Sequence, residues 1–117
     1  MMKARECLNL INELDILIYH KIGRLNEIDE LIGHSCYEEC KKLIDDQILE
    51  CYRERERLYG LLAKLEAKDY NLLSMIYMNG MDYNEVAKLK DTNYNQVCTA
   101  HKRALERLQK IIDKEWK

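Results

Sequence analysis

Proline is absent from this chain of 117 residues, and only four glycines occur. Both residue types interrupt helices, so long helices are permitted over almost the whole length. No apolar run approaches the ~20 residues of a membrane span, and no secretory signal precedes the first predicted helix. The five cysteines are odd in number and lack framework spacing, which favours free thiols in a reducing compartment. We therefore expect a cytoplasmic protein that has no contact with a membrane.

Hydrophobic residues make up 47% of the chain and charged residues 34%, a balance that fits a folded, helix-rich protein. The net charge of −2 hides an asymmetry. Residues 1–67 hold 10 Lys/Arg against 14 Asp/Glu, whereas residues 68–117 hold 9 against 7. Affinity for nucleic acid scales with the number of phosphates that a protein neutralises, so the mildly basic second part predicts weak DNA binding by a monomer. This balance favours a homodimer or a partner protein.

Two long helices are predicted in residues 1–67. The first carries apolar residues at heptad spacing, interrupted only at Lys21; they are Ala4, Cys7, Ile11, Leu14, Ile18, Leu25, Ile28 and Ile32. Gly33 suits the end of this helix, and Ser35 with Glu38 forms a capping-box signature for the next one. The second helix is predicted to carry its apolar face on Tyr37, Ile44, Ile48, Cys51, Leu58, Leu62 and Leu65, with Lys41 and Arg55 as interruptions.

The short connection between these helices predicts an antiparallel hairpin, with arms on the order of 45 Å long at ~1.5 Å per residue. The first apolar stripe is wider than one partner helix can cover, because it also includes Leu8, Leu10, Leu17 and Ile22. We therefore expect residues 1–67 to oligomerise as a coiled coil, with a homodimer as the simplest assembly. The alternating charges of residues 53–57 are interpreted as a solvated face.

Residues 68–117 are predicted to form a three-helix module, which begins with a bracing helix over 69–78 that Asn79-Gly80 ends. Asp82 is a candidate N-cap of the next helix, and Glu85 three residues later completes a capping box. These signals predict a short helix that begins after Asp82, directly after the bracing helix.

A tight turn is predicted at Lys90-Asp91-Thr92, where Asp91 would adopt the left-handed backbone conformation that such turns require. Asn93 can then cap the last helix, with Gln96 at its third position. The last helix is therefore expected to run from Asn93 almost to Trp116.

The last helix has one apolar and one polar side. Its apolar side is predicted to consist of Val97, Ala100, Ala104 and Leu108. Its polar side carries Thr99, Lys102, Arg103 and Arg107. Val86 and Leu89 of the preceding helix share a face that completes the predicted interior. An apolar inner side and a basic outer side after a short turn are typical of a helix-turn-helix.

The stretch from Glu85 to Val97 reads Glu-Val-Ala-Lys-Leu-Lys-Asp-Thr-Asn-Tyr-Asn-Gln-Val, and the tail from His101 to Leu108 reads His-x-Arg-Ala-Leu-x-x-Leu. Both resemble the sigma-70 region 4 type of helix-turn-helix, whose pattern runs roughly Glu-Ile-Ala-x-x-Leu-Gly-x-Ser-x-x-x-Val. Lys90 and Asp91 depart from it, because they stand where an apolar residue and a glycine are usual. The whole chain is similar to small phage and prophage proteins with sigma-like C-termini, some of which are viewed as regulators of late phage transcription.

The resemblance implies sequence-specific binding of double-stranded DNA in transcription control. The residues expected at base edges are Tyr94, Asn95, Gln96 and Thr99, and those expected at phosphates are Lys102, Arg103 and Arg107. His101 lies near the boundary of the two sides and is expected to pack or to touch a phosphate. Two alternatives stay open: a module that docks onto RNA polymerase or a phage factor without reading DNA, and a structural coiled-coil oligomer.

His34, Cys36 and Cys40 invite comparison with a zinc site, but structural zinc needs four ligands and no second close cysteine pair is present. We interpret these residues as buried thiols and a loop histidine. The chain also lacks a Ser/His/Asp arrangement, a paired-carboxylate context and a glycine-rich phosphate loop. The sequence therefore predicts no enzyme, no metal and no cofactor.

Overall fold

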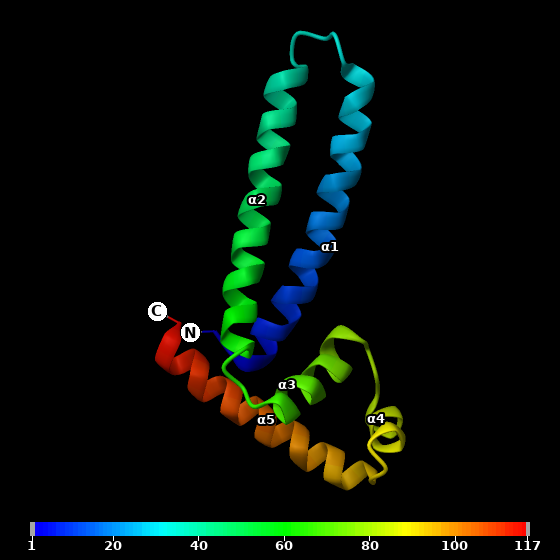
Figure 1. Cartoon of the computed structure of the whole chain (residues 1–117), viewed down its shortest axis with the longest axis vertical. Coiled ribbons are helices and arrows are strands. Elements are labelled where there is room, and N and C mark those ends of the chain that lie inside the picture. The colour runs from blue at the N-terminus through cyan, green and yellow to red at the C-terminus, as the bar shows by residue number, and fades with distance from the viewer. Residues whose placement is uncertain (1, 117) are drawn as a thin grey trace. The chain divides into compact units, whose positions relative to one another are not determined.

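Helices are the only regular secondary structure in residues 2–116, the part of the chain that the computed structural model describes. The five α-helices are α1 (Ala4–Ile28), α2 (Tyr37–Leu62), α3 (Ala67–Leu73), α4 (Tyr83–Leu89) and α5 (Tyr94–Glu115) (Figure 1). A 3₁₀ turn, η1 (Asp29–Leu31), follows α1, and a π-helical turn, η2 (Ser74–Met78), follows α3. The predicted all-α fold is confirmed.

The chain forms two compact units, and α1 and α2 each contribute to both. One unit is Glu13–Arg57, and the other combines Met1–Asn12 with Leu58–Lys117. The start of α1 and the end of α2 therefore belong to the unit that contains α3, α4 and α5. The functional boundary expected at residue 67 stays a prediction.

The unit Glu13–Arg57 holds the later part of α1, the connection and most of α2, which run antiparallel as the predicted hairpin (Figure 1). Its buried apolar side chains all belong to the two predicted stripes: Leu14, Ile18, Ile44 and Cys51. α1 ends at Ile28, earlier than residue 32, and Gly33 has a positive φ of 96° in the connection that follows. α2 begins at Tyr37, and it continues through Gly60 without ending there. No helix in residues 2–116 is both long and apolar enough to span a membrane.

Polar pairs fill the interruptions of the apolar stripes. Arg55 Nη1 donates to Asp15 Oδ1 at 2.9 Å, and Lys21 Nζ donates to Gln47 Oε1 at 2.8 Å. The Arg55 guanidinium also lies 5.0 Å from the centre of the Tyr52 ring. Its side chain is only 28% exposed, so the solvated-face interpretation of residues 53–57 does not hold for Arg55. Such pairs favour one register of the hairpin, because a shifted register would leave the charges unpaired.

In the second unit, α5 packs against α3 and α4. The fully buried side chains of this unit come from all of its helices and include Leu8, Ile11, Leu58, Leu62, Leu73, Val86, Val97, Leu108 and Ile112. Hydrogen bonds attach the start of α1 to this core. The Ala4 N–H donates to Gln109 Oε1 at 2.8 Å, and Asn12 Nδ2 donates to the Tyr77 carbonyl oxygen at 2.5 Å. These first residues are therefore a structural part of the helix-turn-helix unit.

Candidate nucleic-acid interface

The start of α4 has the predicted capping box. Asp82 Oδ1 accepts a hydrogen bond from the Glu85 N–H at 2.8 Å, and Glu85 Oε1 accepts one from the Asp82 N–H at 3.4 Å. The reciprocal bonds satisfy two backbone donors that would otherwise lack partners at the helix start. They fix the residue at which α4 begins.

The turn between α4 and α5 is built on Asp91, whose φ of 53° is left-handed as predicted. The Thr92 N–H donates to the Ala87 carbonyl at 2.9 Å, and the Asp91 N–H donates to the Lys88 carbonyl at 3.3 Å. This pair of bonds is the Schellman arrangement, which ends a helix by satisfying its last carbonyls. A β-branched or bulky residue could not replace Asp91 without backbone strain.

α5 begins with the predicted cap, because Asn93 Oδ1 accepts a hydrogen bond from the Gln96 N–H at 2.9 Å. The Gln96 side chain does not close a reciprocal box on Asn93. Its Oε1 instead accepts a hydrogen bond from the Thr92 hydroxyl. The two contacts connect the turn to the first turn of α5 and set the direction in which the helix leaves it.

The inner side of α5 is rotated from the predicted one. Val97, Ala104 and Leu108 are buried as expected, but Ala100 is exposed and His101 is buried in its place. On α4, Val86 and Ala87 are buried whereas Leu89 is 63% exposed. The predictions for Ala100 and Leu89 are therefore wrong. The reason is tertiary: tyrosines from η2 and α4 cover the His101 side of α5, and residues one step apart on a helix differ by ~100°.

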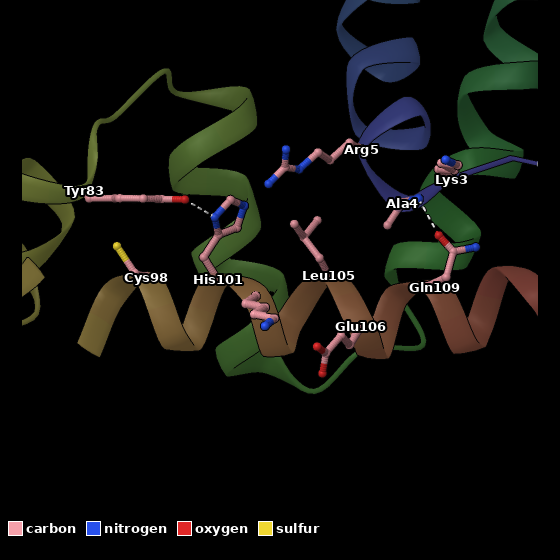
Figure 2. A pocket seen from close by; sticks show the side chains of 10 residues that line it. Lys3, Ala4, Arg5, Tyr83, Cys98, His101, Leu105, Glu106 and Gln109 are labelled. Carbon is pink, nitrogen blue, oxygen red and sulfur yellow. Dashed lines mark hydrogen bonds between the residues drawn. The ribbon is translucent and has the colours of Figure 1, made fainter. Parts of the chain in front are cut away.

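His101 joins these elements through both ring nitrogens. Nε2 lies 2.9 Å from the Tyr77 hydroxyl. Nδ1 hydrogen-bonds the Tyr83 hydroxyl (Figure 2). Burial, together with the nearby charge of Arg5, lowers the pKa of His101 below its usual 6.5. The ring is therefore neutral near pH 7. Of the two roles expected for His101, packing and contact with a phosphate, the structure shows packing.

The outer side of α5 presents the other predicted residues to solvent. Tyr94, Asn95, Gln96, Thr99, Lys102 and Arg103 are all exposed. Four of these residues line one shallow groove of about 370 Å³ together with the exposed Ala100; the four are Asn95, Gln96, Thr99 and Arg103. The remaining two have other surroundings. Lys102 lines a separate pocket, and the ring of Tyr94 packs edge-to-face on Tyr83, with the ring centres 5.4 Å apart. The Thr99 hydroxyl donates to the Asn95 carbonyl at 3.1 Å, which leaves its oxygen free to accept.

Arg107 has a structural partner that the sequence did not indicate. Its Nη1 donates to both carboxylate oxygens of Asp69, each at 2.9 Å. Asp69 lies in the first turn of α3 and is only 4% exposed, whereas the Arg107 side chain is 44% exposed. The guanidinium thus compensates a buried charge and holds α3 against α5. Among the three predicted phosphate ligands, Arg107 is the one already engaged within the protein.

Residues that local patterns missed complete the site. Asp69, Tyr77 and Tyr83 hydrogen-bond side chains of α5, and the charge of Arg5 lies near enough to lower the pKa of His101. None of the four residues stands in a motif that indicates this role. Their partners are 18 or more residues away in the sequence. Cys36 is exposed and Cys40 is half-buried, so the interpretation of both as buried thiols is wrong; all five cysteines are free. No three His, Cys, Asp or Glu side chains in the described residues are placed to hold a metal ion.

Comparison with known proteins gives a distant relative. The chain is similar to the RNA polymerase sigma factor for flagellar operon of Vibrio parahaemolyticus serotype O3:K6 (strain RIMD 2210633), with 26% identity over 90 residues. These residues are 77% of this chain but only 36% of that sigma factor. No family model matches the chain, and no solved structure matches it. The weak similarity to a sigma factor agrees with the resemblance that the helix-turn-helix residues carry.

The backbone of Asp91 generates a test of the turn. Replacement by glycine, which is usual at this position, should leave stability unchanged or raise it by up to about 1 kcal/mol, because relief of left-handed strain is partly offset by unfolded-state entropy. Asp91→Val should lower the free energy of unfolding by more than about 1 kcal/mol, because β-branched residues avoid this conformation. Urea denaturation of the three proteins measures both effects. Clear destabilisation by glycine would mean that the carboxylate of Asp91 has a role of its own.

Arg107 and Arg103 form a matched pair on one helix. Arg107→Ala should lower the free energy of unfolding by about 2 kcal/mol, because it leaves the buried Asp69 carboxylate without its partner. Arg103→Ala should change stability by less than about 0.5 kcal/mol, because the residue is exposed and not in a structural pair. Thermal or urea unfolding of both variants measures the difference. Equal, small effects would show that Asp69 finds adequate compensation from solvent.

Proposed function

We propose that the protein is a sequence-specific DNA-binding regulator of transcription, in which α5 enters the major groove. The observation that carries the proposal is the outer side of α5. Its polar and basic side chains are exposed, whereas the opposite side of the same helix is buried. The helix follows directly on a left-handed turn at Asp91 and is capped by Asn93. This is the arrangement by which a helix-turn-helix presents its second helix. The distant similarity to a sigma factor supports the same class of function. The proposal includes no catalytic step, and it holds for a bacterial or a phage gene alike.

The proposed roles follow position along α5. Asn95 and Thr99 lie one turn apart near the start of the helix, the part that reaches furthest into the groove in this type of module. An asparagine amide can pair bidentately with adenine, and a threonine can meet a base edge or a thymine methyl. Lys102 and Arg103 lie a turn further on and would contact phosphates, which positions the protein without specifying sequence. Arg107 would act mainly through Asp69, with its exposed part near the same backbone.

The DNA-binding test separates specificity from affinity. Asn95→Ala should cost about 1–3 kcal/mol at one base position and relax the preference there. Lys102→Ala should weaken binding to all sequences alike and reduce the salt slope by about one unit. Binding of each variant to a selected operator and to scrambled DNA is measured over a salt series. Lys42→Ala, an exposed lysine of α2, serves as the control and should change neither quantity.

An unchanged affinity in both α5 variants would favour the alternative, a module that docks onto RNA polymerase without reading DNA. One observation supports this second candidate. Leu89 and Tyr94, on either side of the turn, are 63% and 50% exposed, which is more apolar surface than a purely DNA-facing turn needs. The distant relative is itself an RNA polymerase sigma factor. Leu89→Glu should then abolish co-purification with RNA polymerase, while Asn95→Ala should not.

We further propose that the protein acts as a homodimer assembled through the hairpin. The unit Glu13–Arg57 leaves several large apolar side chains exposed, including Ile16, Tyr19, Leu43 and Leu49. A four-helix bundle from two chains would bury them and would also double the phosphate contacts of a weakly basic module. Sedimentation equilibrium should give a dimer at about 10 μM, on the scale of ordinary protein–protein affinities.

Variants of the hairpin test how the dimer forms. The double change Ile16→Glu with Leu43→Glu should convert the dimer to a monomer, because it places unpaired charges in the proposed interface. Asn26→Glu adds charge at an exposed polar site of α1 and should leave the dimer intact. A wild-type monomer at the same concentration would contradict the proposed assembly.

A further inference from the structure

A pocket of about 510 Å³ lies beside α5, on the flank next to the proposed DNA-facing side (Figure 2). The start of α1 forms one wall with Lys3 to Arg5, Tyr83 of α4 forms another, and α5 contributes residues between Cys98 and Gln109. All of these belong to one compact unit. The volume lies within the range of roughly 300–1,000 Å³ that small-molecule sites have. The flank next to a proposed recognition helix therefore carries a space large enough for a ligand.

The charges around this pocket favour an anion. Lys3, Arg5 and Lys102 line it, against the single carboxylate of Glu106. In Figure 2 the Glu106 side chain points to the opposite side of α5 from Arg5. None of the ion pairs found in residues 2–116 involves one of these three cations. Part of the lining is apolar, because Ala4 and Leu105 lie between His101 and Gln109 in Figure 2, and the ring of Tyr83 lies on the other side of His101.

A chain of hydrogen bonds ends at the pocket wall. The Tyr77 hydroxyl lies 2.9 Å from His101 Nε2, and His101 Nδ1 hydrogen-bonds the Tyr83 hydroxyl. A neutral imidazole carries one proton, so one of its ring nitrogens donates and the other accepts. When Nδ1 carries this proton, it donates to the Tyr83 oxygen. The O–H of Tyr83 is then available as a donor at a wall of the pocket.

We propose that this pocket binds a small organic anion, a carboxylate carried on an aromatic or similarly compact apolar body. The carboxylate would accept from the Tyr83 hydroxyl and pair with Arg5 or Lys102, and the apolar body would cover Ala4 and Leu105. The ligand would contact the first turn of α1, the start of α4 and the middle of α5 together. It would thus hold the beginning of the chain against the helix-turn-helix.

Binding is tested on the full-length protein by isothermal titration calorimetry with benzoate, salicylate and phenylacetate. Their uncharged amides serve as isosteric controls, and acetate supplies the charge without the ring. At least one aromatic carboxylate should bind with a Kd below about 1 mM, at least tenfold more tightly than its amide and than acetate. The absence of binding by all three carboxylates, or equal binding of acid and amide, would overturn the proposal.

Variants locate the ligand without depending on a delicate fold. The exposed Arg5→Met removes a cation of the lining and should weaken carboxylate binding about tenfold or more. Glu106→Gln, whose side chain points to the other side of α5 from Arg5, is the control and should change the affinity by less than about twofold. Tyr83→Phe keeps the ring and deletes only the terminal donor, so it should weaken binding about fivefold. Circular dichroism confirms that each variant is folded. An affinity that responds to neither Arg5→Met nor Tyr83→Phe would place the ligand elsewhere and overturn the assignment.

Cys98 gives an independent readout, because it lines the pocket and is partly exposed, whereas Cys36 lies in the other unit and is exposed. Alkylation by iodoacetamide, followed residue by residue with mass spectrometry, should slow at Cys98 when the best carboxylate saturates the protein and stay unchanged at Cys36. Bound ligand that leaves Cys98 as reactive as before would contradict the location.

Lys102 connects this pocket with DNA, and this last step rests on the proposed function. Because the carboxylate would neutralise a cation that is also assigned to a phosphate, it should weaken DNA binding by the wild-type protein several-fold and by Lys102→Ala much less. The two proposals fail separately. Carboxylate binding with no DNA binding at all would reject the proposed function and keep the pocket, and DNA binding with no carboxylate binding would do the reverse.

Discussion

The burial of one side of α5 is the constraint on which the helix-turn-helix unit depends. Val97, Leu108 and Ile112 are almost completely inaccessible, and α3 and α4 both pack on this helix. Each such side chain contributes about 1.5–3 kcal/mol by leaving water. Because the inner side is held this firmly, the outer side has a fixed direction. The polar residues of the candidate interface are presented by a rigid helix and not by a flexible loop.

Two polar contacts set the rotation of α5 about its own axis. His101 reaches the tyrosines of η2 and α4 on one flank, and Arg107 reaches Asp69 of α3 on the other. Rotation of the helix would bring apolar surface to solvent and would also leave a buried imidazole or a buried carboxylate without partners, which is costly. Apolar packing supplies most of the stabilisation, whereas the polar contacts select one arrangement. The same contacts explain why Arg107 is less available to a phosphate than Lys102 or Arg103.

Local signals were sufficient for much of this structure. The caps of α4 and α5 and the left-handed turn could be predicted because each depends on residues within five positions of one another. Burial was harder to predict, because alanine fits either side of a helix and only the neighbouring elements decide. For that reason Ala100, which was expected on the inner side, is exposed, and His101, which was expected at the boundary, is buried. The pairing of Arg107 with Asp69 joins residues 38 positions apart, so no local pattern could indicate it. Arg55 was misinterpreted in the same way, since its partner Asp15 lies on the other helix of the hairpin.

The hydrogen bond between Thr92 and Gln96 orients the Gln96 amide. Its Oε1 accepts from the Thr92 hydroxyl, which leaves this oxygen one further lone pair and leaves the amide N–H₂ group two protons. The amide cannot rotate without losing this bond, so its N–H₂ group keeps one direction. A threonine of the turn thus fixes the orientation of an exposed side chain on the first turn of α5.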